Sequence, residues 1–314
     1  MPESKTQSNI KPLVSVALPV FNRAPIIGRT IESILAQTFQ DFELIIVDDG
    51  STDGIEGVMR AYEDDRMRYV RHAENRGLMA ARNTGVRESL GVFLAFQDSD
   101  DIWHPKKLEE EIALLHAAPL SVGGVYSRVE KTYINGSTMR IPSDDQKTVD
   151  GNLLKVFLRG DYFITLQALL VRRECIDRVG AFDENFKVFG DGEFIIRFAK
   201  HFEFVYNPNI RVLLKVQNDS ISLDQKKRLT AKERLFEKER ETYSRFPGIY
   251  AANAFSLGRA FAFAGDTSKA KIFIWEAIRV RPWRFSYFVF FLLLALGGSG
   301  GVRTLGKWLQ KLRI

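Results

Sequence analysis

Two groups of carboxylates stand directly after runs of hydrophobic residues. Asp48 and Asp49 follow the run FELIIV, and Asp98, Asp100 and Asp101 follow the run VFLAFQ. Carboxylates repel one another and are costly to bury, so each group needs a positive charge or hydrogen-bond donors close by. A hard divalent cation prefers oxygen ligands, which makes the second group a candidate metal site. An acid–base pair and a solvated turn are the alternatives.

The elements around these carboxylates alternate between strand and helix. Continuous hydrophobic runs predict strands at 14–20, 42–48, 67–72 and 92–97, and apolar residues at helical spacing predict helices between them. This alternation is typical of a mostly parallel sheet with helices on both faces. Ligands of such sheets bind beyond the carboxyl ends of the strands. We therefore expect the two acidic strand ends to meet at one site.

The rest of the chain has a different pattern. Residues 120–220 mix predicted strands and a helix with a loop rich in Phe and acids, GAFDENFKVFGDGEF, which fits an acceptor-side region. After residue 224 the chain is predicted to be helical, with two antiparallel helices joined at Gly265-Asp266. We expect a flexible tail at 1–12, an α/β domain at 13–223, a helical extension at 224–282 and an apolar, basic tail at 283–314.

The net charge of +6 lies in the C-terminal part of the chain. Residues 269–314 hold nine Lys and Arg against one acid, Glu276, so the body is near neutral and a nucleic-acid partner is not expected. Residues 285–302 carry no charge, and the apolar residues of 303–314 share one helical face. This pattern is typical of a helix that lies on an anionic membrane surface. A spanning helix and a helix packed on the body are the alternatives.

The chain has one cysteine, Cys175, and its first twelve residues are polar. One cysteine allows no disulfide within the chain, which is typical of a reducing compartment. We expect Cys175 to be a small buried residue. Because no signal peptide is recognised, we expect a cytoplasmic protein that is peripheral on the inner face of the cell membrane.

The motifs PVFN, VDDGSTD, GLMAARN and DSDD occur in this order before the acidic loop. A lone D-x-D is a weak signal, but the ordered set resembles the inverting family 2 glycosyltransferases of GT-A fold over residues 1–220. The resemblance implies a Rossmann-like mixed sheet, a nucleotide-diphosphate sugar donor and a Mn²⁺ or Mg²⁺ ion. It also implies a hydroxyl of a glycan or lipid-linked acceptor, in cell-surface polysaccharide synthesis.

The resemblance assigns donor-binding roles near the first two strand ends. Pro19, Phe21 and Asn22 fall where the loop after the first strand cradles the nucleotide, with Phe21 able to stack on the base. Asp49 matches the acid that hydrogen-bonds the base. The alternative for Asp49 is a simple turn residue.

The ARN and DSDD motifs are expected to continue the donor site. Arg82 would meet a phosphate or a base edge with its fork, or else pair with Asp48 or Asp98. By resemblance, Asp98 contacts the ribose or sugar, and Asp100 binds the metal that holds the diphosphate. Asp101 has no assigned role beyond tuning this site.

The acceptor side is expected in the acidic loop. By resemblance, Asp191 is the base that deprotonates the acceptor hydroxyl, although Gly190 stands where relatives carry Glu. A helix cap is the alternative role for Asp191, and Asp183 and Glu184 are alternative bases. The role of Glu193 is left open.

Two positions near the end of the α/β domain differ from the family pattern, and one histidine follows the DSDD motif. Lys215 and Gln217 stand near where many relatives carry Arg and His, so metal or phosphate binding from that side is expected to be weaker. His104 is expected to have a surface or capping role.

Two other classes fit parts of the pattern. A sugar nucleotidyltransferase also uses a nucleotide, a metal and acids, but LPVFNRAPII lacks the Gly-rich phosphate loop such enzymes usually have. A degenerate glycan-binding or scaffold protein is the other alternative.

Overall fold

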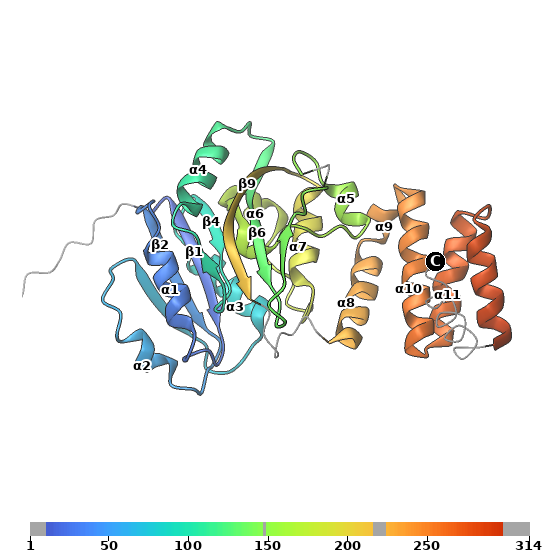
Figure 1. Ribbon diagram of the computed structural model, residues 1–314, viewed down its shortest axis with the longest axis horizontal. Helices are drawn as coiled ribbons and strands as arrows, with labels where there is room; N and C mark the ends of the chain where they lie inside the picture. The colour runs from blue at the N-terminus through green and yellow to red at the C-terminus, as the bar shows by residue number, and fades with distance from the viewer. Residues whose placement is uncertain (1–10, 147–148, 216–223, 298–314) are drawn as a thin grey trace, which may run out of the picture. The chain divides into compact units, whose positions relative to one another are not determined.

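The computed structural model describes residues 11–146, 149–215 and 224–297 (Figure 1). The chain divides into two compact units. Unit 1 comprises Met1–Phe157 and Tyr162–Ser220, and unit 2 comprises Leu158–Asp161 and Ile221–Ile314.

The described part of unit 1 contains a nine-stranded mixed sheet in the order β3-β2-β1-β4-β8-β6-β9-β5, with β7 paired to β6. The four strands predicted from hydrophobic runs, β1 to β4, are parallel neighbours. β8 joins β4 and β6 in antiparallel pairing, whereas β9 runs parallel to β6. The strands are β1 Val14–Val20, β2 Phe42–Asp48, β3 Met67–Arg71, β4 Phe93–Phe96, β5 Ile102–Trp103, β6 Val122–Thr132, β7 Thr138–Ile141, β8 Leu169–Arg172 and β9 Glu203–Lys215.

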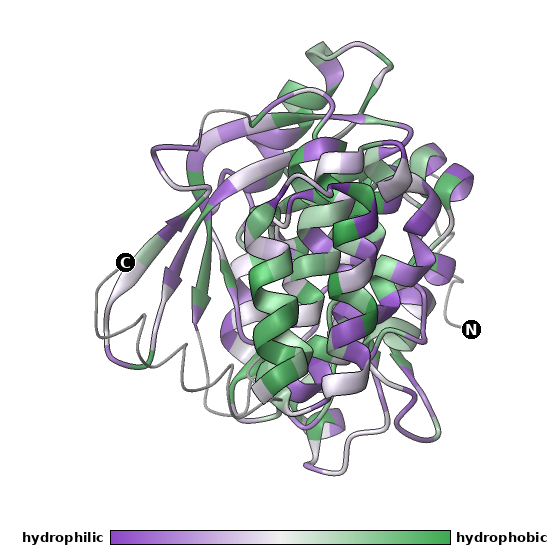
Figure 2. Cartoon of the chain, turned by 90° about the vertical axis from the view of Figure 1, so that its right-hand side faces the viewer, coloured by the Kyte–Doolittle hydropathy of each residue, from purple (hydrophilic) through white to green (hydrophobic). Residues whose placement is uncertain are grey.

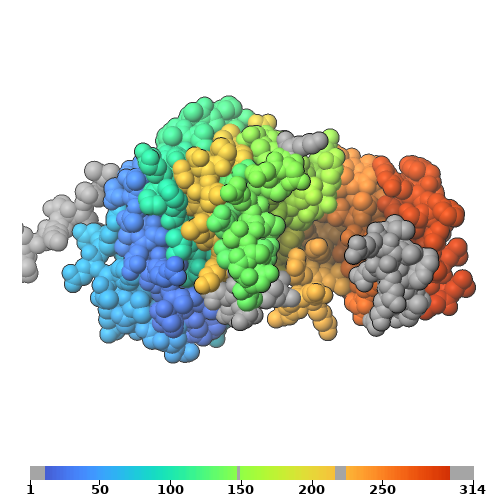
Figure 3. Space-filling model, viewed as in Figure 1, coloured from blue at the N-terminus to red at the C-terminus, as the bar shows by residue number. Residues whose placement is uncertain are grey.

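The antiparallel additions make the sheet mixed, as the resemblance implied, rather than mostly parallel. β6 and β9, coloured green and yellow, lie side by side on the surface seen in Figure 3. The helices of unit 1 are α1 Ile27–Leu35, α2 Ile55–Met59, α3 Leu78–Glu88, α4 Lys107–Ala117, α5 Leu154–Leu158, α6 Arg173–Val179 and α7 Gly190–Ala199, with a 3₁₀ turn at Leu166–Ala168.

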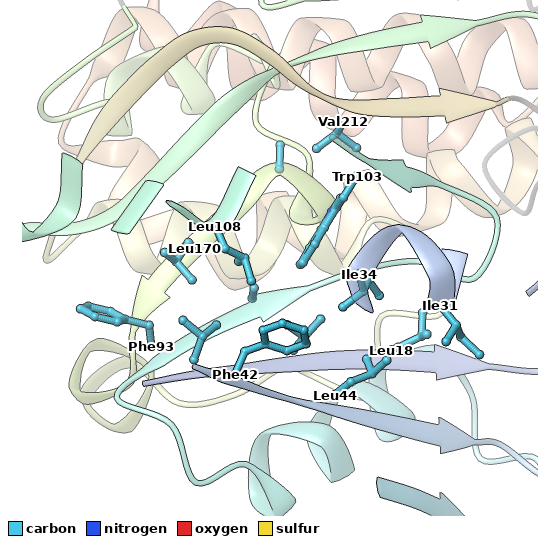
Figure 4. Packing of buried hydrophobic residues seen from close by; sticks show 14 of the residues in the cluster. Leu18, Ile31, Ile34, Phe42, Leu44, Phe93, Trp103, Leu108, Leu170 and Val212 are labelled. Carbon is cyan, nitrogen blue, oxygen red and sulfur yellow. The ribbon is translucent and has the colours of Figure 1, made fainter. Parts of the chain in front are cut away.

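Every residue of β1 and β2 is buried, because helices cover both faces of the sheet. Leu18 and Leu44 face a large cluster that includes residues of α1 and α4 (Figure 4). Ala81 of α3 packs against Ile45 and Val47, whose side chains point to the other face of the sheet. The carboxyl ends of β1, β2 and β4 therefore lie between α1 and α3.

Unit 2 is helical. Its elements are α8 Gln225–Lys238, α9 Arg240–Ser244, α10 Pro247–Ala264 and α11 Thr267–Val280, followed by helical residues 285–297. α10 and α11 meet at the predicted turn: Gly265 has φ 96, and the Asp266 carboxylate accepts the Lys269 backbone N–H at 3.0 Å. Among the described residues, no helix combines the length and apolarity needed to cross a membrane.

Candidate active site

The loop after β1 is bound to the loop after β2. The Asn22 backbone N–H donates to the Ser51 hydroxyl at 2.9 Å, and the Thr52 N–H donates to Asn22 Oδ1 at 2.8 Å. Asn22 has φ 51, a conformation that Asn tolerates better than most residues. Pro19 is buried within β1, whereas Phe21 exposes 43% of its surface. Of the three residues expected to cradle a nucleotide, Phe21 presents the ring that can stack on a base.

Asp48 and Asp49 have separate structural partners. Asp48 is fully buried and accepts hydrogen bonds from the Ser51 N–H at 2.8 Å and the Tyr69 hydroxyl at 2.5 Å. Asp49 accepts the backbone N–H groups of Arg76 at 2.9 Å and Gly77 at 2.7 Å. Asp49 therefore links the end of β2 to the start of α3. Its Oδ2 accepts one of these bonds, which leaves capacity for a further donor.

His72 also binds Asp49, and sequence reasoning did not single it out. Its Nδ1 lies 2.7 Å from Asp49 Oδ1, and its Nε2 lies 2.9 Å from the Thr84 hydroxyl. The signal for His72 was its position directly after β3, since the carboxyl end of β3 lies beside that of β2.

Arg82 lies between two carboxylates. It exposes 1% of its surface, and its two terminal nitrogens donate to Asp98 Oδ1, at 2.8 Å, and to Asp191 Oδ1. Pairing with Asp98 was one of the expected alternatives; the bond to Asp191 was not anticipated. The guanidinium carbon lies 5.7 Å from the centre of the Phe182 ring. One cation thus joins the end of β4 to the first turn of α7.

Asp98 is held on both oxygens. The second oxygen accepts a hydrogen bond from the Gln167 side-chain amide, and the Gln167 carbonyl accepts the Trp103 Nε1–H at 3.0 Å. The Asp98 side chain remains 26% exposed. Gln167 belongs to the 3₁₀ turn before β8, and no sequence pattern pointed to it.

Asp101 is the buried member of the DSDD motif. It exposes 5% of its surface, and its carboxylate accepts the Lys215 backbone N–H at 3.3 Å. Burial raises the pKa of Asp101 to about 9, and the neighbouring charges of Asp98 and Asp100 act in the same direction. A carboxyl with this pKa is protonated at pH 7, so the negative charges at this strand end are those of Asp98 and Asp100.

The carboxylate of Asp100 is the type of ligand that a hard cation prefers. Asp98 and Asp191 share the one cation of Arg82, and the charge of Asp100 adds to theirs, so negative charge exceeds positive charge at this strand end. Among the described residues, no group of three or more His, Cys, Asp or Glu side chains could hold a metal. A cation at Asp100 would take its other ligands from phosphate oxygens and water.

Asp191 lies in the first turn of α7, with 38% of its side chain exposed. The residue before the helix, Phe189, has φ 67, an unusual conformation for a bulky residue that is often found at functional sites. Burial raises the pKa of Asp191, the Arg82 charge lowers it, and the Asp98 charge raises it further. A carboxylate with a raised pKa and access to solvent is suited to general-base catalysis.

Gly190 and Glu193 have structural explanations. A Cβ atom at Gly190 would clash with the sulfur of Met79 on α3, so a larger residue there requires the Met79 side chain to move. Glu193 is fully buried and forms a two-pronged pair with Arg197, at 2.8 and 2.9 Å. Arg197 also donates to the carbonyl groups of residues 179–181, so this pair holds α7 to the preceding loop.

The remaining candidates lie outside this cluster. Glu184 accepts a hydrogen bond from Asn83 at 2.9 Å, and Asp183 accepts the Asn185 N–H at 3.0 Å within the loop. His104 is exposed, in agreement with a surface role, and its Nδ1 accepts the Lys106 backbone N–H at 3.4 Å just before α4. Gln217 lies outside the described residues. Cys175 is buried, as predicted.

Comparison with known proteins gives a consistent picture. The family model described as glycosyl transferase family 2 matches residues 15–179. The Escherichia coli protein named UDP-Glc:alpha-D-GlcNAc-diphosphoundecaprenol beta-1,3-glucosyltransferase WfgD is 37% identical over 103 residues, covering 33% of this chain and 41% of that protein. Matches to curated relatives span between 15% and 66% of those proteins' lengths.

Two solved structures share the fold. Staphylococcus aureus TarS 1–349 in complex with UDP-GlcNAc has a TM-score of 0.69 at 17% identity, covering 96% of this chain and 92% of that one. The Pyrobaculum calidifontis mannosyltransferase PcManGT in complex with GDP-Man and Mn²⁺ has a TM-score of 0.56 at 20% identity, covering 96% of this chain and 88% of that one. At these identities the likeness concerns the fold. The matched family model covers more than half of the chain, and the chain therefore belongs to glycosyl transferase family 2.

Proposed function

We propose that this protein is a metal-dependent inverting glycosyltransferase that moves a sugar from a nucleotide-diphosphate donor to an acceptor hydroxyl in polysaccharide synthesis. The observation that carries the proposal is the bridge made by Arg82. It brings the donor-side Asp98 and the acceptor-side Asp191 to one guanidinium, although they are far apart in the sequence.

The donor would lie across the carboxyl ends of β1, β2 and β4. Phe21 is exposed for stacking on the base, and Asp49 Oδ2 has capacity for a further donor group. Asp98 is fixed by Arg82 and Gln167 and offers its exposed edge to a ribose or sugar hydroxyl. Asp100 would hold Mn²⁺ or Mg²⁺, which supplies positive charge to the departing diphosphate.

The acceptor hydroxyl would approach Asp191. The carboxylate takes the proton as the hydroxyl oxygen attacks the anomeric carbon from the face opposite the diphosphate. The new glycosidic bond forms as the bond to the diphosphate oxygen breaks, which inverts the configuration. Glu193 takes no part, because both of its oxygens are bound to Arg197.

Donor turnover tests the assignment. With Mn²⁺ present, we expect Asp100→Ala and Asp191→Asn to lose most sugar transfer, at least a hundredfold for the loss of a general base. Asp183→Asn, on the neighbouring loop, is the matched control and keeps near-normal turnover. Near-normal turnover in both site variants would refute the assignment, and release of pyrophosphate from a sugar phosphate and a nucleoside triphosphate would indicate a nucleotidyltransferase.

The acceptor is proposed to be attached to a membrane lipid, as the name of the relative WfgD indicates for that protein. Hydrophobic residues line the unit 2 helices that face the viewer in Figure 2. Within 275–297, several large apolar side chains are exposed: Trp275 50%, Trp283 73%, Phe285 78%, Leu292 57% and Leu296 88%. This combination of exposed aromatic and aliphatic side chains with the basic C-terminal part suits the inner face of an anionic membrane.

Vesicle flotation tests this part of the proposal. We expect the full chain to float with phosphatidylglycerol vesicles, and the triple variant Trp283→Ser, Phe285→Ser, Leu296→Ser to remain largely in solution. Leu120→Ser is the matched control, because Leu120 is 81% exposed but belongs to unit 1. Equal flotation of the triple variant and the control would contradict lipid attachment through this surface.

A further inference from the structure

The hydrogen bonds of Arg82 leave it little access to a bound ligand. Its side chain exposes 1% of its surface, and both terminal nitrogens are bound to carboxylates. Its Nε is buried without a hydrogen-bond partner among the described residues. Arg82 therefore reaches the substrates through Asp98 and Asp191, and not through a direct contact of its own.

The same residues continue into a longer chain of hydrogen bonds. Trp103 donates to the Gln167 carbonyl, the Gln167 amide donates to Asp98, and Arg82 joins Asp98 to Asp191. These residues come from β5, the 3₁₀ turn, the end of β4, α3 and α7. Because both oxygens of Asp98 are held, Asp98 anchors one terminal nitrogen of the guanidinium, and the other terminal nitrogen binds one oxygen of Asp191.

We propose that Arg82 is a positioning residue, whose fork holds the donor-side Asp98 and the base Asp191 at a set spacing and aims the second oxygen of Asp191 at the acceptor hydroxyl. The inference rests on the proposed function, because it takes Asp191 as the base. A lysine replaces Arg82 only in part, since its ammonium can donate to both carboxylates but lacks the rigid planar fork that sets their spacing.

The charges around Asp191 lead to a distinctive test. Arg82 faces it from α3 and Asp98 faces it from the end of β4, while on α7 itself Glu193 is paired with Arg197. The positive neighbour lowers the pKa of Asp191 and the negative neighbour raises it. Removing the Arg82 charge must therefore raise the pKa of Asp191, and removing the Asp98 charge must lower it.

The experiment is the pH profile of kcat/KM for sugar transfer. The base works in its ionised form, so activity falls below its pKa. We expect Arg82→Met to move this acid limb to higher pH by about 1 to 3 units. Asp98→Asn moves it to lower pH, although its overall rate also falls. Arg173→Met, which removes an arginine of unit 1 that is bound to the carbonyl groups of Ser89 and Gly91, lowers stability and leaves the limb in place.

Shifts of the Arg82→Met and Asp98→Asn limbs in the same direction, or unshifted limbs in both, overturn the inference. If Arg82→Met does not fold, the double-variant cycle described below, which uses Arg82→Lys, decides the question. If the wild-type chain transfers sugar and Asp191→Asn does not, an unexpected pH profile in these variants rules out only the positioning role of Arg82. The proposed function then remains intact.

A second measurement does not depend on activity. In a double-variant cycle of Arg82→Lys and Asp191→Asn, we expect the double variant to lose less Tm than the two single losses combined, because both remove the same interaction. Strictly additive losses overturn the inference. If the cycle shows clear coupling but the wild-type chain transfers no sugar, the proposed function is refuted and the bridge between Arg82 and Asp191 stands.

Discussion

The ion pair between Lys107 and Glu111 of α4 offers a stringent test of how unit 1 is held together. Both side chains are fully buried, with Lys107 Nζ 2.5 Å from Glu111 Oε2. The ammonium also lies 4.3 Å from the centre of the Trp103 ring, and the Ser127 hydroxyl donates to Glu111. Burial lowers the pKa of Lys107 and raises that of Glu111, while each charge stabilises the other.

Removing one partner leaves the other charge buried. In Lys107→Met, Glu111 must either remain charged, which costs about 3–5 kcal/mol, or take up a proton. A glutamate in an unfolded chain ionises near pH 4.3, so holding it protonated at pH 7.3 costs about 4 kcal/mol. We therefore expect unit 1 to lose about 4 kcal/mol of unfolding free energy at pH 7.3 in this variant.

The two single variants should respond to pH with opposite signs. In Lys107→Met the folded-state pKa of Glu111 is raised, so the loss shrinks by about 1.4 kcal/mol for each pH unit as the pH falls toward 4.3. In Glu111→Gln the folded-state pKa of Lys107 is lowered, so the loss shrinks as the pH rises toward 10. The double variant Lys107→Met, Glu111→Gln recovers at least half of the summed losses.

Urea unfolding followed by hydrogen exchange of α4 and β6 peptides measures these values for unit 1 separately from unit 2. Arg60→Met is the control, because Arg60 pairs with Glu56 at 3.9 Å with 82% of its side chain exposed, and such surface pairs contribute little. Single losses below about 1 kcal/mol, additive losses in the double variant, or the same pH trend in both singles would refute the reasoning.

Three further predictions concern the site. Asp49→Asn loses about 3 kcal/mol of unfolding free energy, measured by urea unfolding, because an amide has one accepting oxygen, uncharged, for the two backbone N–H groups that Asp49 binds. The same variant weakens nucleoside-diphosphate binding, measured by calorimetry. Gly50→Ala lowers Tm more than Gly54→Ala does. Both glycines have positive φ, but a Cβ at Gly50 would lie 2.7 Å from a backbone carbon of residue 74, whereas a Cβ at Gly54 would meet open space. Equal losses of Tm would contradict this packing. Gly190→Ala reduces sugar transfer by displacing the start of α7, and adding Met79→Ala restores part of the rate. An unchanged rate of sugar transfer in Gly190→Ala would show that this close packing is unimportant.

The first half of the sheet was predictable because its signals are local and strong. β1 and β2 are seven-residue runs of buried residues, and the acidic residues follow directly after them. The α10–α11 turn was marked by Gly265 and Asp266, which cap the two helices. In contrast, β5, β7 and β8 are only two to four residues long, and none of them belongs to a longer predicted run, as the four-residue β4 does in VFLAFQ. The chain after residue 224 is helical, as predicted, and its first part is divided at Glu239 into α8 and α9.

The sequence by itself determined which strands end in carboxylates and that those ends share one edge of the sheet, because hydrophobic runs and helical spacing follow from the chain's local chemistry. Only the tertiary structure decided the partners. Arg82 meets Asp98 and Asp191, which lie 16 and 109 residues further along the chain. Lys107 and Glu111 have the spacing of a solvated helical pair, yet packing of α4 against β6 buries both. Such pairings depend on which faces the fold brings together, and no local pattern encodes that.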